Sequence, residues 1–336
     1  MSSSTFENIT ISGMVSAIPE NSEGISLENQ TASDLAFEAA TKLLYESKIC
    51  KDQIGVILFL STTPDYRSPA TAMVLQNRLD INPDCIAFDI NSGGCGFLHG
   101  LQVGAGFLKS ISKDFALVLF GDTSSKQFLH KDENKLAYTD AASAVLLNKT
   151  ETGMNWHFIN KTKSQYYQKF ILRKGGYRDA IYKSDEEPLS GLSELAPMLI
   201  ESEAILPLQE EMIGNAVEDY FLCTGKAVKD FDYVFFDHNN SSDFSRLREK
   251  FGIEVSQTSF NDYKNGHSRG SFLPLLMEKT FGENIKHPET SCRILLASFG
   301  EGLTISVGDI SLAPSAIFQY LKTNSSYTEG FITHEI

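Results

Sequence analysis

A strand, a glycine-rich turn and a helix follow one another within residues 85–101, and this succession constrains the fold more than any other segment. Apolar residues typical of a buried strand occupy 86–90, and the turn reads Ser-Gly-Gly-Cys-Gly over 92–96. Apolar residues at helical spacing then continue through Phe107. A turn of this kind presents a side chain at a helix N-terminus, where backbone N–H groups and the helix dipole stabilise an anion. The segment therefore predicts an α/β fold with a chemically useful elbow.

Cys95 is the nucleophile-capable residue of this elbow. A thiol at a helix N-terminus has a lowered pKa and becomes a usable nucleophile. The alternative is a small buried cysteine that fills space beside glycines, because free cysteine is among the most buried residue types. Both interpretations of Cys95, a catalytic thiol and a packing residue, stay open at this point.

Composition excludes several classes of protein. With 336 residues and 42% hydrophobic content, the chain can bury a large core as two domains or as one large α/β unit. No apolar run approaches the roughly 20 residues of a membrane span, and the first residues lack a signal-peptide pattern, so we expect a cytoplasmic protein. Five cysteines without paired spacing predict neither disulfides nor a metal site. The net charge of −14 argues against nucleic acid and anionic membranes as partners.

The succession of strands and helices is similar in the two parts of the chain. Continuous apolar runs predict buried strands at 55–60, 85–90, 116–120, 143–147, 232–237, 293–298 and 303–307. Helical spacing predicts helices at 33–47, 68–79, 96–112, 242–251 and 270–281. The strand and elbow near position 90 correspond to the segment that leads into the helix near position 270, so the pattern indicates two related halves.

Ordered blocks of the sequence resemble the ketoacyl-ACP synthase III branch of the thiolase superfamily. The resemblance is carried by residues 61–70, 87–101, 116–124, 139–147, 233–240, 266–275 and 298–303. It implies a thiolase-type α/β fold, a duplicated βαβαβαββ core arranged as a five-layer αβαβα sandwich. It also implies a dimer that pairs through the strand and helix around the elbow.

The elbow departs from the family pattern by one position. Over residues 89–97 the chain keeps the family's length, so the family's cysteine falls on Gly94 and Cys95 takes the place of the next small residue. One residue along a helix is a rotation of about 100°. Cys95 therefore points elsewhere unless Gly93 and Gly94, which can adopt unusual backbone angles, reshape the turn.

Two histidines fall on family positions. His238 matches the family's histidine, and His267 stands where the family has an asparagine. Other synthases of the superfamily use a Cys-His-His set, and the resemblance implies that Cys95 accepts an acyl group while both imidazoles serve as acid/base and carbonyl partners. Taken singly, each histidine also has a structural interpretation. Backbone N–H groups at Gly94, Gly300 and Gly302 are the expected oxyanion donors.

Charged segments bear on the substrate. Residues 15–25 form a short acidic segment without arginine, where the family carries an arginine-rich loop that grips the CoA nucleotide. We therefore expect an acyl group on the phosphopantetheine arm of an acyl carrier protein in preference to CoA, and no cofactor of the protein's own. The predicted docking patch for the acidic carrier consists of Arg246, Arg248, Lys250 and Arg269. A solvated helix face is the alternative interpretation of this cluster.

The expected organisation has four parts: an N-terminal half at 1–150, an insertion at 151–225 that covers the acyl tunnel, a C-terminal half at 226–310 and an unassigned extension at 311–336. An ordinary surface excursion is the alternative for the insertion. Three functions remain in view. The first is a β-ketoacyl synthase III-like acyltransferase or condensing enzyme in a specialised acyl or polyketide pathway, acting as a homodimer or a heterodimer. The second is a non-acylating partner subunit of a heterodimeric ketosynthase, and the third is an acyl-chain-binding module.

Overall fold

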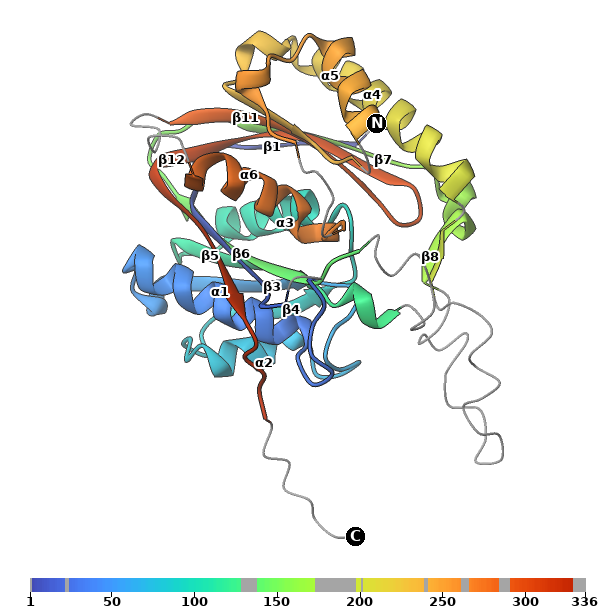
Figure 1. The fold of residues 1–336 in the computed structure, drawn as a ribbon. Coiled ribbons are helices and arrows are strands. Elements are labelled where there is room, and N and C mark those ends of the chain that lie inside the picture. Colours follow the sequence, from blue (N-terminus) through green and yellow to red (C-terminus); the bar gives the residue numbers. More distant parts are fainter. Residues whose placement is uncertain are drawn as a thin grey trace, which may run out of the picture.

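Five layers make up the computed structural model, which describes residues 2–21, 24–127, 138–172, 198–200, 202–238, 241–260, 266–283 and 291–328. Figure 1 shows α3 and α6 between two sheets, with α1 and α2 beneath the lower sheet and α4 and α5 above the upper one. The helices are α1 (Ala32–Ser47), α2 (Thr71–Arg78), α3 (Gly96–Ser110), α4 (Ser202–Thr224), α5 (Ser241–Phe251) and α6 (Phe272–Glu283). The predicted thiolase-type αβαβα sandwich is thus confirmed.

The strands of both layers join through one long strand. In chain order they are β1 (Ser2–Phe6), β2 (Ile9–Pro19), β3 (Ile54–Leu60), β4 (Ile86–Ile90), β5 (Phe115–Asp122), β6 (Ala141–Lys149), β7 (Trp156–Thr162), β8 (Phe170–Leu172), β9 (Met198–Ile200), β10 (Tyr233–Phe236), β11 (Cys292–Gly300) and β12 (Thr304–Thr323). The main path runs β1-β7-β12-β2-β6-β5-β3-β4, and β11 pairs with β12 and β10, whereas β8 and β9 form a separate two-stranded sheet. The beginning of β12 lies antiparallel to β7 and β11, whereas its end lies parallel to β2.

Three apolar clusters correspond to the spaces between the layers. The largest lies around α3 and α6 and includes Phe97, Phe120 and Phe272. A second cluster packs α1 and α2 against the lower sheet, and a third packs α4 and α5 against the upper sheet. The strands are apolar on both faces because each sheet is covered on both sides. This explains why continuous apolar runs predicted β3, β4, β5, β6, β10, β11 and the start of β12, whereas β1, β2, β7, β8 and β9 were not predicted.

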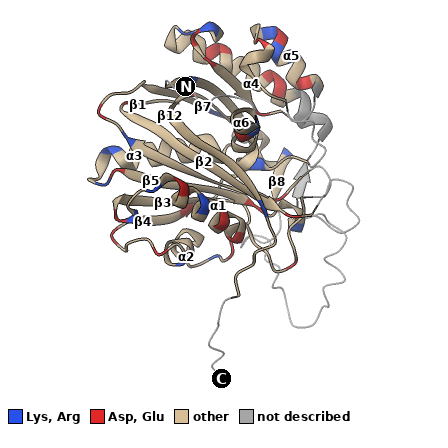
Figure 2. Ribbon diagram, turned by 60° about the vertical axis from the view of Figure 1, so that its left-hand side comes forward, with Lys and Arg blue, Asp and Glu red and all other residues tan. Residues whose placement is uncertain are grey.

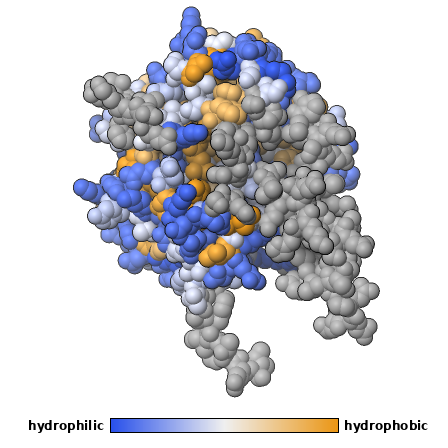
Figure 3. All heavy atoms as spheres, in the orientation of Figure 1, coloured by the Kyte–Doolittle hydropathy of each residue, from blue (hydrophilic) through white to orange (hydrophobic). Residues whose placement is uncertain are grey.

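Hydrophobic residues also reach the surface. On the face in Figure 3 they gather in the middle part, while the outer parts of that face are mostly hydrophilic.

At the edge of the lower sheet, β4 pairs with β3 alone among the described strands. Its first residue, Ile86, is 37% exposed. An edge strand with apolar side chains is a ready site for pairing with a second chain.

Three sequence predictions need correction in the described residues. The segment 151–225 was expected to cover the tunnel, yet it supplies β7 and α4 to the layers themselves, and 173–197 lies outside the described residues. The extension 311–336 is not separate, because residues through Thr323 continue β12. The acidic segment 15–25 is only partly a loop, since residues through Pro19 belong to β2.

Candidate active site

The elbow between β4 and α3 lies against the end of β11. A Cβ atom built on Gly94 would lie 2.1 Å from the backbone oxygen of Phe299, a distance that real Cβ atoms do not reach. Position 94 therefore holds glycine because the elbow and β11 approach each other backbone to backbone. A side chain at the family's cysteine position would require the end of β11 to move.

Cys95 turns into the core. Its side chain is 0% exposed, and its Sγ donates to the backbone oxygen of Thr304 at 3.4 Å. Burial raises the pKa of the Cys95 thiol, and the carboxylates of Asp237 and Glu301 add to this effect. The environment is therefore the opposite of the electropositive, accessible one that a nucleophilic thiolate needs. This geometry favours the packing interpretation of Cys95.

His238 follows β10 in a pocket of aromatic rings. Its Nδ1 lies 2.7 Å from the backbone oxygen of Phe236, which can only accept, so Nδ1 carries the proton. Its ring contacts Phe260, Phe272 and Phe244 with centroid distances of 5.4, 5.2 and 4.7 Å. Burial lowers the pKa of His238 to about 4, so the imidazole is neutral at pH 7. Its Nε2 can therefore accept a proton or a hydrogen bond.

His267 is held by two polar contacts. Its Nδ1 accepts the backbone N–H of Arg269 at 2.9 Å, and its Nε2 donates to Asp237 at 2.7 Å. Its ring stacks on Phe272 with a centroid distance of 4.4 Å. Because both nitrogens are engaged within the protein, His267 does not direct a nitrogen at a substrate in this arrangement. The expectation that both imidazoles bind the thioester carbonyl needs this correction for His267, which instead orients Asp237.

Arg269 was predicted on the docking surface, and this is wrong, because only 2% of the residue is exposed. Its guanidinium donates to Thr62 at 3.2 Å and to Gln127 at 3.1 Å, and it also pairs with Glu301. The guanidinium lies over the ring of Tyr138 at 5.1 Å. Arg269 is therefore the buried charged centre of a polar cluster beside the elbow and not a contact for a partner protein.

Glu301 was missed by the sequence reasoning. Its carboxylate accepts the backbone N–H of Gly94 at 3.1 Å and pairs with Arg269, and its side chain is 20% exposed. The available signal was a glutamate between two glycines, Gly300 and Gly302, inside a block that carries the family resemblance. The expected oxyanion donor Gly94 therefore already has an acceptor from the chain itself.

The two other predicted oxyanion glycines shape the turn between β11 and β12. A Cβ atom on Gly300 would lie 2.8 Å from the backbone nitrogen of Cys95, so glycine is needed for this close approach. Gly302 has a φ of 69°, the left-handed region that glycine adopts without strain. Both glycines thus place Glu301 over the elbow, and their role as oxyanion donors stays a prediction.

A second acid lies near Arg269. Asp122 at the end of β5 accepts the backbone N–H and the hydroxyl of Thr62, both at 2.7 Å. Burial raises the pKa of Asp122 to about 6, although Arg269 acts in the opposite direction. The polar cluster around Arg269 thus contains a buried acid whose pKa lies just below neutral pH.

The remaining cations of the predicted docking patch lie on or near the surface. Arg246 pairs with Glu210 and Asp243, and Lys250 pairs with Glu218. Arg248 is half-buried. Figure 2 shows blue and red residues side by side on α5. Since acids accompany these cations, the local field is weaker than the count of basic residues implies, and carrier docking here stays a prediction.

Within the described ranges, no cluster of three or more His, Cys, Asp or Glu side chains has the arrangement of a metal site. None of the helices in that part of the chain has the length and apolar character required to cross a bilayer.

Comparisons with known proteins agree with this geometry. Residues 88–163 match the family model for 3-oxoacyl-[acyl-carrier-protein] synthase III. A β-ketoacyl-[acyl-carrier-protein] synthase III of Streptomyces coelicolor is 27% identical over 83% of this chain and 82% of its own length. The synthase III of Latilactobacillus sakei is 25% identical over 83% and 85% of the two chains.

A solved structure gives the same fold. The 3-oxoacyl-(acyl-carrier protein) synthase from Burkholderia xenovorans superposes with a TM-score of 0.85 at 22% identity, over 96% of this chain and 99% of that one. At this identity the structural likeness establishes the fold alone. The sequence matches show in addition that the chain is similar to synthases of this type. The predicted resemblance is confirmed: the chain is similar to ketoacyl-ACP synthase III proteins and has a thiolase-type fold.

Proposed function

We propose that the protein is a condensing acyltransferase of the ketoacyl synthase III type that acts on acyl thioesters. The observation that supports this best is the pair of imidazoles around Phe272. His238 is neutral with its proton on Nδ1, and His267 is hydrogen-bonded to Asp237. His238 falls on the family's histidine position and His267 on the position of its asparagine, and the curated relatives carry the name of β-ketoacyl-ACP synthases.

The chemistry follows from these groups. In a condensation, a carbanion forms beside one thioester carbonyl by loss of a proton or of CO2 and attacks the carbonyl carbon of a second acyl thioester. A C–C bond forms, the C–S bond of the second thioester breaks and its thiolate leaves, while negative charge develops on the carbonyl oxygens. The neutral His238 carries its proton on Nδ1, so its Nε2 can take a proton and can return it only after it has been protonated. His267 and Asp237 together hold the end of β10 next to the backbone of Phe299, whose N–H lies 3.4 Å from Asp237. His267 thus acts as a positioning residue.

In this proposal Cys95 is the residue that accepts the acyl group. Its thiol has to break the hydrogen bond to Thr304 before it can react. One observation favours a second candidate, a non-acylating partner subunit. Cys95 is fully buried with a raised pKa, and Gly94 has no space for a side chain. A chain with these features would contribute a cleft and an interface while a sister chain carries the acyl group.

Phosphopantetheine of an acyl carrier protein or of CoA is the proposed source of the thioester, with the carrier protein preferred. A second chain is the other proposed partner, in a homodimer or a heterodimer. The β4 edge supports it, because β4 is a short edge strand with a half-exposed apolar start at Ile86. The cytoplasmic location stays a prediction.

Intact-protein mass spectrometry after incubation with acyl-CoA and acyl-carrier thioesters tests the two candidates. A condensing enzyme that uses Cys95 gains the mass of the acyl group, and Cys95→Ala loses this adduct. Cys292→Ala is a matched control, since Cys292 is also buried. An absence of any adduct, or an adduct on one of the four other cysteines, would exclude the Cys95 mechanism and support the partner subunit.

A further inference from the structure

The carboxylate of Glu301 lies directly on the elbow. Its Oε2 accepts the N–H of Gly94 at 3.1 Å. A Cβ atom on Gly93 would lie 2.5 Å from Oε1 and 2.7 Å from Oε2, so the carboxylate fills the space beside this glycine. Gly94 lies in the turn just before the N-cap of α3, Cys95, and Glu301 supplies the acceptor for its N–H from within the chain.

The backbone presents Glu301 to this position. It stands between β11 and β12 in a turn where Gly302 and Leu303 have φ values of 69° and 55°. A positive φ is costly for leucine, and the packed core holds it, since Leu303 is fully buried. The turn is thus fixed, while the carboxylate at its tip, with a 20% exposed side chain, has access to water.

Arg269 is the second contact of this carboxylate. Its side chain is 1% exposed, and Thr62 and Gln127 accept from it on its other sides. A buried guanidinium needs a charge partner, because removal of the partner leaves an uncompensated buried charge. Arg269 thus pulls Glu301 inward, whereas exposure to water allows Glu301 to turn outward. In the structure the carboxylate faces inward and occupies the N–H of Gly94.

We propose that Glu301 is a plug of the elbow, which competes with the acyl carbonyl oxygen for the N–H of Gly94. This inference rests on the proposed function, because it assumes that an acyl thioester enters the cleft. An acyl oxygen and the Glu301 carboxylate cannot both accept this one N–H with good geometry. The elbow therefore binds acyl groups only when Glu301 turns toward solvent, and Glu301 sets the affinity of the cleft.

The first test asks whether the contact exists in solution. Labelling with carbonyl-¹³C and ¹⁵N glycine selects glycines that follow a glycine, and the sequence has two of these, Gly94 and Gly176. At the same pH, the amide signal of Gly94 is expected at different chemical shifts in the wild type and in Glu301→Gln, because the charged acceptor of this N–H is replaced. A Gly94 signal that is the same in both proteins would overturn the plug whether or not the protein is an acyltransferase.

The second test measures binding of octanoyl-pantetheine with an amide in place of the thioester, by calorimetry at pH 7.5. Glu301→Gln keeps the shape but loses the attraction to Arg269, so we expect it to bind about tenfold more tightly than the wild type. The double variant R269S/E301G removes both charges, avoids an unpaired buried cation and is expected to bind at least as tightly. Glu218→Gln, which breaks the surface pair with Lys250, is the control and leaves the affinity unchanged.

Equal affinities of the wild type and both opened variants would overturn the plug. An absence of binding in all of them would overturn it as well, because an opened elbow that takes no acyl oxygen has nothing to exclude. Failure of the proposed function is seen separately, as an absence of acyl adducts and condensation products in every variant. A lower affinity of Glu301→Gln would assign Glu301 a direct role in binding the ligand and would contradict the competition.

Discussion

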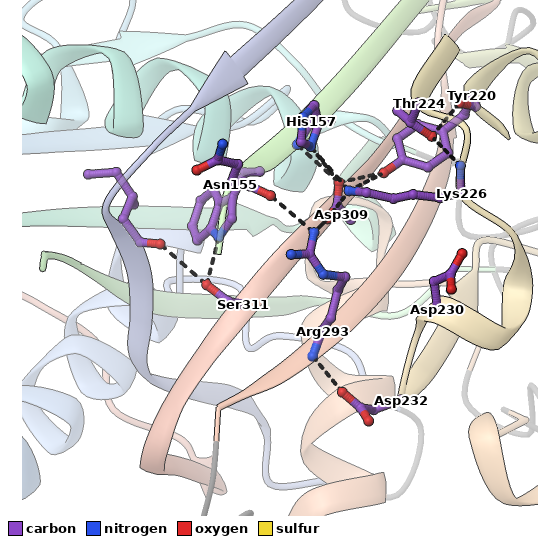
Figure 4. A network of polar contacts seen from close by, with 12 residues as sticks. Asn155, His157, Tyr220, Thr224, Lys226, Asp230, Asp232, Arg293, Asp309 and Ser311 are labelled. Atoms are coloured by element: carbon purple, nitrogen blue, oxygen red, sulfur yellow. Dashed lines mark hydrogen bonds and ion pairs between the residues drawn. The ribbon is translucent and has the colours of Figure 1, made fainter. Parts of the chain in front are cut away.

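This protein has two networks of buried ion pairs that differ in the sign of the central charge. One network surrounds an acid with donors, and the other surrounds a cation with acceptors. In the upper sheet, the fully buried carboxylate of Asp309 is surrounded by donors, as Figure 4 shows. It accepts from Lys226 at 2.8 Å, from the backbone N–H of His157 at 3.0 Å, and from Tyr220 and Arg293. In the cleft, the buried cation Arg269 is surrounded by acceptors, and Glu301, the acid paired with it, is partly exposed.

The two networks differ in whether a partner of the central charge is exposed to water and can therefore break its ion pair. The donors to Asp309 come from β7, β11, α4 and the turn after α4, so this network joins elements of the upper layers and needs no ligand. The partner of Arg269 that reaches water also covers the elbow. A saturated buried pair thus contributes to the integrity of the fold, whereas a pair with one exposed member can exchange that member for a substrate group.

The largest effect is expected for Asp309→Ala. The change leaves Arg293 and Lys226 near one another without the acid between them, and we expect a loss of about 3–5 kcal/mol in the free energy of unfolding. Urea unfolding measures this loss. Asp219→Ala removes a half-exposed partner of Lys161 and is the control, with an expected loss of less than about 1 kcal/mol. Similar losses in both variants would contradict the distinction between the two networks.

Opposing titrations in the cleft give the next effect. His238 has a folded pKa of about 4 against 6.5 in the unfolded chain, so its contribution to stability is present above pH 6.5 and is lost as pH falls toward 4. Asp122 has a folded pKa of about 6 against 3.8, so its contribution is present below pH 3.8 and is lost as pH rises toward 6. Each contribution is about 3 kcal/mol, and they oppose each other between pH 4 and 6.

Single variants separate these contributions. In Asp122→Asn the His238 contribution stands alone, so we expect stability to fall more steeply than in the wild type from pH 6 to pH 4. In His238→Phe, which suits the aromatic surroundings, stability is expected to rise as pH falls over the same range. Thermal unfolding at pH 4, 5 and 6 measures both slopes. If both variants keep the slope of the wild type, the opposing titrations do not exist.

The sequence predicts the layers better than the segments where the chain crosses between them. Continuous apolar runs locate β3, β5 and β11, since each is covered on both faces. The end of β12 was missed because Pro314 lies in the register shift between Leu312 and Ile317, and a proline inside an apolar run argues against a strand. The helix α4 was missed because Pro207 interrupts its pattern near the start.

The site residues in local sequence motifs were predicted, and those defined by contacts between distant parts of the chain were not. His238 and His267 were found because they stand in local motifs at the ends of elements. The burial of Arg269 was not predicted, because its partners lie 32, 142 and 207 positions away in Glu301, Gln127 and Thr62. From the sequence alone, Arg269 is expected to be exposed like the other basic residues of the predicted patch. Its acceptors become neighbours only in the tertiary structure. Charge pairing over such separations leaves no periodic signal in the sequence.

The smallest effect concerns one donor of the saturated network. Tyr220 is fully buried, and its hydroxyl donates to Asp309. In Tyr220→Phe the carboxylate keeps Lys226, Arg293 and the N–H of His157, so we expect a loss of only about 1 kcal/mol in the free energy of unfolding. Calorimetric unfolding measures it, and acyl-ligand affinity is expected to stay unchanged because no cleft group moves. A loss as large as that of Asp309→Ala would mean that the hydroxyl holds the network together, and the description of Asp309 as saturated by several independent donors would be wrong.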